Sequence, residues 1–180
     1  KLIEAWEAAG KPSNVRCLLS AHGLPEIVVK SGDPYQWQVE RTVAALRPLL
    51  PSEWEIEICY QSRVGPLKWI GPPTDASIEK AAIDGKAILL SPIAFVSEHI
   101  ETLVELDIEY RHLADKHGVK HYIRAPALGV DEGFIGTLAD LVEETLADPD
   151  KSIRSSCGGR ICPANWRDCP NRRASVTKAA

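Results

Sequence analysis

Residues 15–25 of the chain read VRCLLSAHGLP, an apolar run followed at once by a loop that contains a glycine and a proline. A short apolar run bounded by turn-forming residues predicts a buried β-strand, here over residues 15–20. Further strands are predicted at residues 87–90 and 119–123, and at residues 54–60, where apolar and polar residues alternate.

Helical patterns separate these strands, and strands that alternate with helices imply βαβ crossovers. Such crossovers build a parallel sheet that is covered by helices on both faces. We therefore predict an α/β fold with a parallel four-stranded sheet flanked by helices and an irregular, cysteine-containing C-terminal tail. The expected helices cover residues 2–10, 35–47, 74–85, about 97–117 and 133–147, with Thr74 or Asp75 and Ser97 as N-caps.

The length of 180 residues suits one domain. We assign residues 1–150 to this domain and residues 151–180 to the tail. A formal net charge of −4 gives no electrostatic argument for a nucleic-acid partner.

No apolar run approaches the ~18 residues of a membrane span, and no targeting signal opens the chain. We therefore expect a cytoplasmic protein, with peripheral attachment to the inner membrane as an alternative. Because the chain begins at Lys1 and contains no Met, we expect a fragment.

His22 follows the first predicted strand by two residues, which places it at the mouth of the sheet, where such folds bind ligands. An imidazole can exchange a proton or bind a metal near neutral pH. The alternative is a loop histidine that hydrogen-bonds the backbone. Glu101, at the start of the long predicted helix, follows another strand and is expected to face the same cleft. A nitrogen and an oxygen donor together suit a divalent transition metal.

The long predicted helix carries no Lys or Arg between Pro92 and Tyr110. Its acidic residues lie within an arc of about 80° in an ideal helix, and such a stripe suits the attraction of a cation or the passage of protons. A water-facing surface is the alternative. Asp107 lies on the apolar side, where we expect Arg111 as its partner. The acidic residues of the stripe are Glu98, Glu101, Glu105 and Glu109, and the apolar packing surface is expected to include Ile100, Leu103, Val104 and Ile108.

Residues 61–75 form a loop rich in glycine and proline that presents Trp69, whose ring can pack on a flat ligand. The alternative is a structural loop held by a buried tryptophan.

Three cysteines, Cys157, Cys162 and Cys169, crowd the tail in the spacing C-x4-C-x6-C. Clustered thiolates suit zinc or an iron–sulfur cluster, and both usually take four protein ligands. The fourth ligand is then Cys17, Cys59, a histidine or a residue outside the chain. Cys17 and Cys59 lie in apolar runs, where we expect small buried side chains.

Several segments together resemble the ferrochelatase family from about Val15 to Glu144. They are SAHGLP (20–25), GDPY (32–35), QSRVGPLKWIGPPTD (61–75) and SPIAFVSEHIETLVELDIEY (91–110). The resemblance implies the second of two similar Rossmann-like halves, with residues 1–12 as the helix that leads in from the first half. It further implies a lyase of haem biosynthesis that inserts Fe²⁺ into protoporphyrin IX to form protohaem and releases two protons.

The same resemblance implies roles for individual residues. His22 is the metal ligand or pyrrole base, and Glu101 is its partner across the porphyrin. The chelation site also includes His99, and the helix is often widened there into a π-type turn. Two alternatives stay open: a non-catalytic porphyrin- or metal-binding domain, and a chelatase for another tetrapyrrole such as coproporphyrin. The resemblance also implies a path for protons or metal along Glu98, Glu105 and Glu109. It places Trp69 and Phe95 in the porphyrin pocket. It assigns the ligands of a [2Fe–2S] cluster to Cys157, Cys162 and Cys169.

Overall fold

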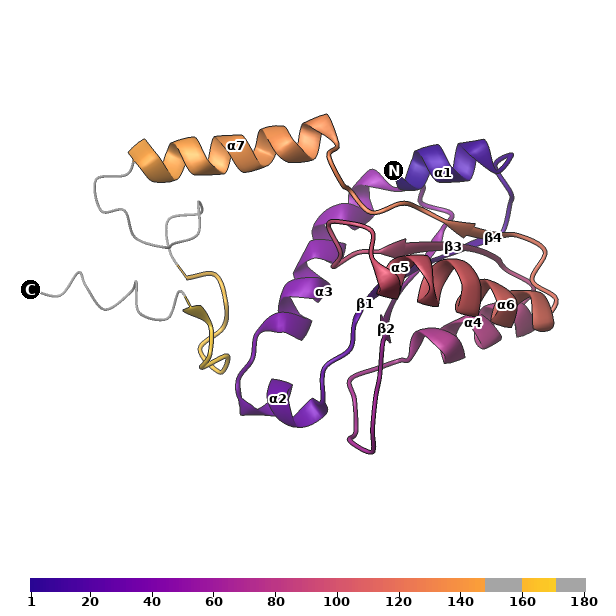
Figure 1. The fold of residues 1–180 in the computed structure, drawn as a ribbon, viewed down its shortest axis with the longest axis horizontal. Coiled ribbons are helices and arrows are strands. Elements are labelled where there is room, and N and C mark those ends of the chain that lie inside the picture. Colours follow the sequence, from indigo (N-terminus) through magenta and orange to yellow (C-terminus); the bar gives the residue numbers. More distant parts are fainter. Residues whose placement is uncertain (148–159, 171–180) are drawn as a thin grey trace, which may run out of the picture. The chain divides into compact units, whose positions relative to one another are not determined.

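The computed structural model describes residues 1–147 and 160–170 (Figure 1). Four parallel strands form one sheet in the order β2-β1-β3-β4, which confirms the predicted α/β fold. The strands are β1 (Val15–His22), β2 (Glu55–Gln61), β3 (Ala87–Pro92) and β4 (Tyr122–Arg124).

The register of the sheet aligns the carboxyl ends of its central strands. His22, the last residue of β1, lies opposite Gln61, the last residue of β2. On the other side of β1, Ser20 lies opposite Pro92, the last residue of β3. The loops that leave these three strands therefore begin next to one another.

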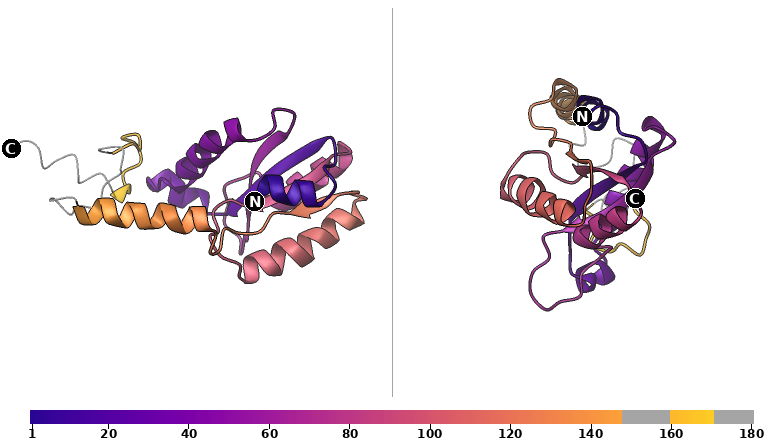
Figure 2. Two further views of the ribbon diagram at one scale, coloured as in Figure 1. Left: turned by 90° about the horizontal axis from the view of Figure 1, so that it is seen from above. Right: turned by 90° about the vertical axis from the view of Figure 1, so that its right-hand side faces the viewer.

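Helices cover both faces of the sheet, as Figure 2 shows. Because successive side chains of a strand point to opposite faces, Leu18 packs with α4 and α6 on one face, whereas Cys17 and Leu19 pack with α1 and α3 on the other. Burial on both faces explains why β1 reads as a continuous apolar run. These helices are α1 (Leu2–Ala8), α3 (Tyr35–Leu46), α4 (Thr74–Ile83) and α6 (Tyr110–Lys116).

The chain divides into two compact units. The first comprises residues 1–26 and 37–129 and contains the sheet, together with the 3₁₀ turn η1 (Arg47–Leu49). The second comprises residues 27–36 and 130–180 and contains α7 (Glu132–Ala147). No helix of the described ranges has the length and apolar content that a membrane crossing needs.

The predicted long helix contains the π-type turn that the resemblance implies, but its predicted N-cap is wrong. The helix begins with α5 (Ile100–Leu103), continues through the π-turn η2 (Glu105–Glu109) and ends with α6. His99 rather than Ser97 is the N-cap: its ring accepts a hydrogen bond from Glu101 N–H, and the Thr102 hydroxyl accepts one from His99 N–H. One further helix, α2 (Glu26–Ser31), was not predicted.

The expected pairing of Asp107 with Arg111 is also wrong. Asp107 accepts hydrogen bonds from Nε and Nη2 of Arg124 in β4, at 2.7 and 2.6 Å. Arg111 donates to the carbonyl oxygen of Tyr122 at 3.2 Å. A π-turn holds more residues than an α-turn, so side chains four positions apart no longer lie on one face.

The apolar residues assigned to the packing surface of this helix are exposed, contrary to prediction. The helix packs instead through Thr102 and Leu106, which are fully buried. The exposed residues are Ile100, Leu103, Val104 and Ile108.

Ile88 and Ile83 offer a matched test of the core. Ile88 in β3 is 0% exposed, whereas Ile83 at the end of α4 is 84% exposed. We expect Ile88→Ala to lower the free energy of unfolding by about 2–5 kcal/mol, because it leaves a cavity in the core. Ile83→Ala should change that free energy by less than about 0.5 kcal/mol. Urea unfolding followed by circular dichroism measures both, and equal losses would contradict this assignment of the core.

Candidate functional site

His22 and Glu101 come together at the carboxyl edge of the sheet. His22 ends β1, and Glu101 lies in the first turn of α5, which follows the neighbouring strand β3. Nε2 of His22 lies 3.7 Å from Oε1 of Glu101, and the two side chains are 39% and 37% exposed. An imidazole and a carboxylate therefore converge within reach of solvent, in the arrangement that the sequence predicted.

The orientation of the His22 ring is held by a hydrogen bond from Nδ1 to the carbonyl oxygen of Gly23 at 2.7 Å. A carbonyl oxygen can only accept, so Nδ1 carries the proton in the neutral ring. Nε2 then keeps its lone pair on the side of Glu101. Such a nitrogen can take up a proton or bind a metal ion.

Gly23 lets the loop of residues 61–75 approach the segment that follows His22. A Cβ on Gly23 would lie 3.0 Å from the carbonyl oxygen of Gln61 and 3.1 Å from the ring of Trp69. Trp69 also pairs with Pro25 in an isolated antiparallel bridge. Its indole nitrogen is buried without a hydrogen-bond partner among the described residues. Trp69 thus fastens the loop beside the candidate site.

Phe95 lies near both histidines of the site. Its ring centroid is 6.5 Å from that of His22 and 5.0 Å from that of His99. Nδ1 of His99 accepts a hydrogen bond from the backbone N–H of Glu101 at 3.2 Å. His99 therefore fixes the start of the helix that carries Glu101.

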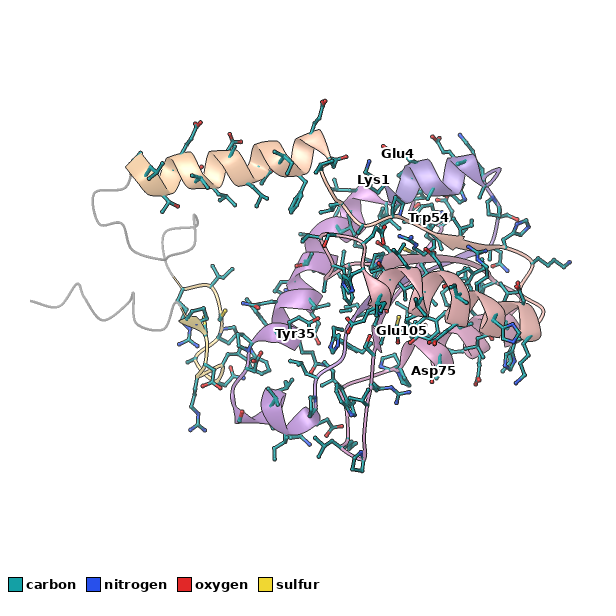
Figure 3. All side chains as sticks on the ribbon, in the orientation of Figure 1. Lys1, Glu4, Tyr35, Trp54, Asp75 and Glu105 are labelled. Atoms are coloured by element: carbon teal, nitrogen blue, oxygen red, sulfur yellow. The ribbon has the colours of Figure 1, made fainter. Side chains whose placement is uncertain are left out.

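The acidic residues along the helix occupy different environments. The Glu105 carboxylate accepts hydrogen bonds from Ser62 N–H at 2.8 Å, the Tyr110 hydroxyl at 2.9 Å and the Gln61 amide at 3.0 Å, and also from the Ser62 hydroxyl. Burial, together with the negative charge of Glu105, raises the pKa of Tyr110, which therefore remains a hydrogen-bond donor. Figure 3 labels Glu105 on this helix. Glu109 is exposed.

Glu98 precedes the helix and does not continue a stripe with Glu101. Its carboxylate contacts Arg124 Nη1 at 2.5 Å and accepts a hydrogen bond from Ala127 N–H at 2.8 Å. Burial acts to raise the pKa of Glu98, but hydrogen bonds from Thr102, Arg124 and Ala127 outweigh it and leave that pKa lowered. Glu98 is therefore an ionised partner of Arg124. The expected unbroken acidic stripe is wrong because the helix begins only at Ile100.

An apolar cavity of about 410 Å³ adjoins Phe95 on the side of α1 and α3. Its wall is formed by residues from α1, α3, η1, the segment after β3 and residues 126–128. Sequence reasoning missed it because these segments are far apart along the chain.

Two of the tail cysteines lie in the second unit and are buried, Cys162 at 7% and Cys169 at 3% exposure. Cys157 lies outside the described residues. Burial, with the hydrogen bond and charge of Cys169, raises the pKa of Cys162. Arg160 shapes this loop by donating to the carbonyl oxygens of Cys162 at 2.8 Å, Pro163 at 2.5 Å and Trp166 at 2.8 Å.

The cysteine loop contacts the turn after α2, within the same unit. Asp168 N–H donates to the carbonyl oxygen of Gly32 at 3.1 Å. Gly32 has φ +124, and a Cβ there would lie 3.0 Å from the backbone nitrogen of Arg167. Within residues 1–147 and 160–170, no three metal-binding side chains come together.

Cys17 and Cys59 are fully buried in the sheet, as predicted. Burial raises the pKa of each thiol to about 12. Neither is open to a ligand from outside its core.

A family model described as Ferrochelatase matches residues 1–146. The chain is 57% identical over 170 residues to a ferrochelatase of Hyphomonas neptunium, covering 94% of this chain and 47% of that protein. It is 55% identical over 173 residues to one of Phenylobacterium zucineum (96% and 50%) and 52% identical over 172 residues to one of Caulobacter vibrioides (96% and 49%). The chain spans about half the length of these curated relatives. Because the family model covers most of its residues, the chain belongs to the ferrochelatase family.

Proposed function

We propose that this chain is the second half of a metal chelatase that inserts Fe²⁺ into protoporphyrin IX, forms protohaem and releases two protons. The observation that carries the proposal is the pair of His22 Nε2 and Glu101 Oε1, 3.7 Å apart and partly open to solvent. The curated relatives, all named ferrochelatase, supply the reaction class.

The reaction exchanges two pyrrole protons for one divalent cation, so its site needs a base and a metal ligand. His22 Nε2 has a free lone pair in the neutral ring, because Nδ1 is committed to Gly23. We assign His22 to proton removal or iron binding. Glu101 would act beside it as ligand or base rather than across the porphyrin, because side-chain atoms 3.7 Å apart leave no room for a ring between them. His99 holds the Glu101 backbone in place.

The negative charges of the helix would attract iron and guide protons away. Glu105 and Glu109 follow Glu101 along η2, and Glu98 precedes it. Because Arg124 neutralises Glu98, we place the stronger attraction at Glu105 and Glu109. Trp69 and Phe95 would contact the porphyrin, whose remaining contacts we assign to the other half of the enzyme. We also propose that this enzyme, which we expect in the cytoplasm, makes peripheral contact with the inner membrane, because its porphyrin substrate is apolar.

We further propose a [2Fe–2S] cluster on Cys157, Cys162 and Cys169. Two buried thiols in one folded loop fit such a cluster, because thiolates shielded from solvent are its usual ligands. The fourth ligand would be a histidine or a residue outside the chain, since Cys17 and Cys59 are enclosed in the sheet. When bound, the cluster would supply a redox-active centre that crosslinks the tail.

His22→Ala should lower the rate of metal insertion at least about 100-fold, because it removes the base or ligand of the reaction. The assay follows porphyrin fluorescence in the enzyme comprising both halves, with Fe²⁺ or Zn²⁺ added. Insertion changes the emission, whereas binding alone leaves the free-base spectrum. The matched control is His112→Ala, at an exposed position of α6, which should keep the parental rate. A fully active His22→Ala enzyme would remove His22 from the mechanism.

Gly32→Ala should lower the iron and sulfide content of the purified enzyme, because the added Cβ would displace the cysteine loop at Arg167. Visible absorption per protein measures the cluster, and circular dichroism checks the fold. The control is Gly85→Ala, which also replaces a glycine of positive φ (+63) but meets nothing within 4 Å. If the parent protein is colourless and free of iron, the cluster proposal is wrong. A coloured parent with an equally coloured Gly32→Ala variant would refute the docking contact alone.

A further inference from the structure

We infer that Gln61 is a positioning residue that sets the separation of His22 and Glu101. The inference rests on the proposed chelation reaction. Gln61 ends β2, lies opposite His22 in the sheet and is only 1% exposed. A buried amide is retained at low cost only when its polar atoms are hydrogen-bonded.

The Gln61 side chain joins the two strands and the helix that form the site. Its Oε1 accepts a hydrogen bond from the Ser20 hydroxyl at 2.8 Å, two residues before His22 in β1. Its Nε2 donates to the backbone carbonyl oxygen of Glu101 at 2.8 Å. Its own backbone oxygen accepts a hydrogen bond from Gly23 N–H at 2.9 Å. One residue thus contacts the chain on both sides of His22 and the backbone of Glu101.

Only an amide satisfies these partners. Nε2 donates to two acceptors, the Glu101 carbonyl oxygen at 2.8 Å and the Glu105 carboxylate at 3.0 Å. Oε1 faces a hydroxyl that donates, which fixes the orientation of the amide. The Ser20 hydroxyl is in turn 2.9 Å from that of Thr74 at the start of α4. A carboxylate or an apolar side chain at position 61 would leave buried acceptors unpaired.

The neighbouring residue strengthens the same junction. Ser62 has φ +60, in the left-handed region that non-glycine residues rarely adopt. Its N–H and hydroxyl both donate to Glu105, which holds that conformation. The end of β2 is therefore fastened to the π-turn through two adjacent residues. The short helix α5 lies between this junction and its cap at His99.

Catalytic pairs tolerate little displacement, and a shift of about 1 Å can reduce a rate about 100-fold. Gln61 does not contact the imidazole or the carboxylate themselves. It acts on the backbone that carries them, so its loss should reduce the reaction step more than porphyrin binding.

The test replaces Gln61 by Leu and by Asn in the enzyme comprising both halves. Leu removes every hydrogen bond of the side chain, whereas Asn keeps the amide but is one methylene too short to reach Ser20 and Glu101 together. We expect each variant to lower kcat for Zn²⁺ insertion at least about 10-fold, with the KM for porphyrin changed less than about two-fold. Should Gln61→Leu fail to fold, Gln61→Asn alone decides. A parental kcat in Gln61→Asn would overturn the inference.

A double-mutant cycle separates positioning from general destabilisation. If Gln61 acts through Glu101, Gln61→Asn should lower the rate less than about two-fold further in a Glu101→Gln background. An equal loss in both backgrounds would overturn the inference.

The matched control is Ser77→Ala. Ser77 is 2% exposed, and its hydroxyl donates a hydrogen bond of 2.6 Å to Glu57, away from the site. It should lower Tm while kcat stays parental.

The outcomes also separate this inference from the proposed function. A parent enzyme that inserts no metal would overturn the proposed function and this inference with it. A parent that inserts metal, while Gln61→Asn matches it, would overturn this inference alone.

Discussion

The parallel register of three strand ends is the constraint on which the site depends. His22 is opposite Gln61, and Ser20 is opposite Pro92, so the loops after β1, β2 and β3 begin at one edge. The helix that follows β3 then carries Glu101 back to within 3.7 Å of His22. A slip of one residue in either pairing would turn the side chains of a strand to the other face and separate the pair.

Hydrogen bonds from residues outside the helix offset the repulsion among its carboxylates. Between Pro92 and Tyr110 there is no cation to relieve the repulsion among carboxylates. Arg124 from β4 contacts both Glu98 and Asp107, and its pKa is raised chiefly by its hydrogen bonds to Asp107. Neutral donors from Gln61, Ser62 and Tyr110 satisfy Glu105. Glu101 is left as the carboxylate that faces His22. The surrounding fold therefore determines which carboxylates of the helix are paired and which one faces His22.

In the second unit, hydrogen bonds to the backbone hold the cysteine loop. In its cysteine loop, Arg160 donates hydrogen bonds to three backbone carbonyl oxygens and thereby holds the shape of the loop. A segment of this kind gains stability when its thiols are crosslinked, because the crosslink reduces the conformational freedom of the unfolded chain. The close contact of Gly32 with Arg167 shows why a residue without a Cβ stands in the GDPY segment.

The sequence by itself determined the strands, most helices, the α/β class and the two residues that meet at the strand ends. These features follow from hydrophobic periodicity and from the rule that ligands bind at carboxyl ends, both of which are visible within short segments. Only the tertiary structure decided that Arg124 is the partner of Asp107 and that Gln61 links the two sides of the site. Both depend on atoms contributed by segments that lie far apart along the chain, and pairings between such segments leave no periodic signal in the sequence. The sequence signal for Gln61 is a polar residue at the end of a buried strand. That signal can be interpreted only when the register of the sheet places Gln61 opposite His22.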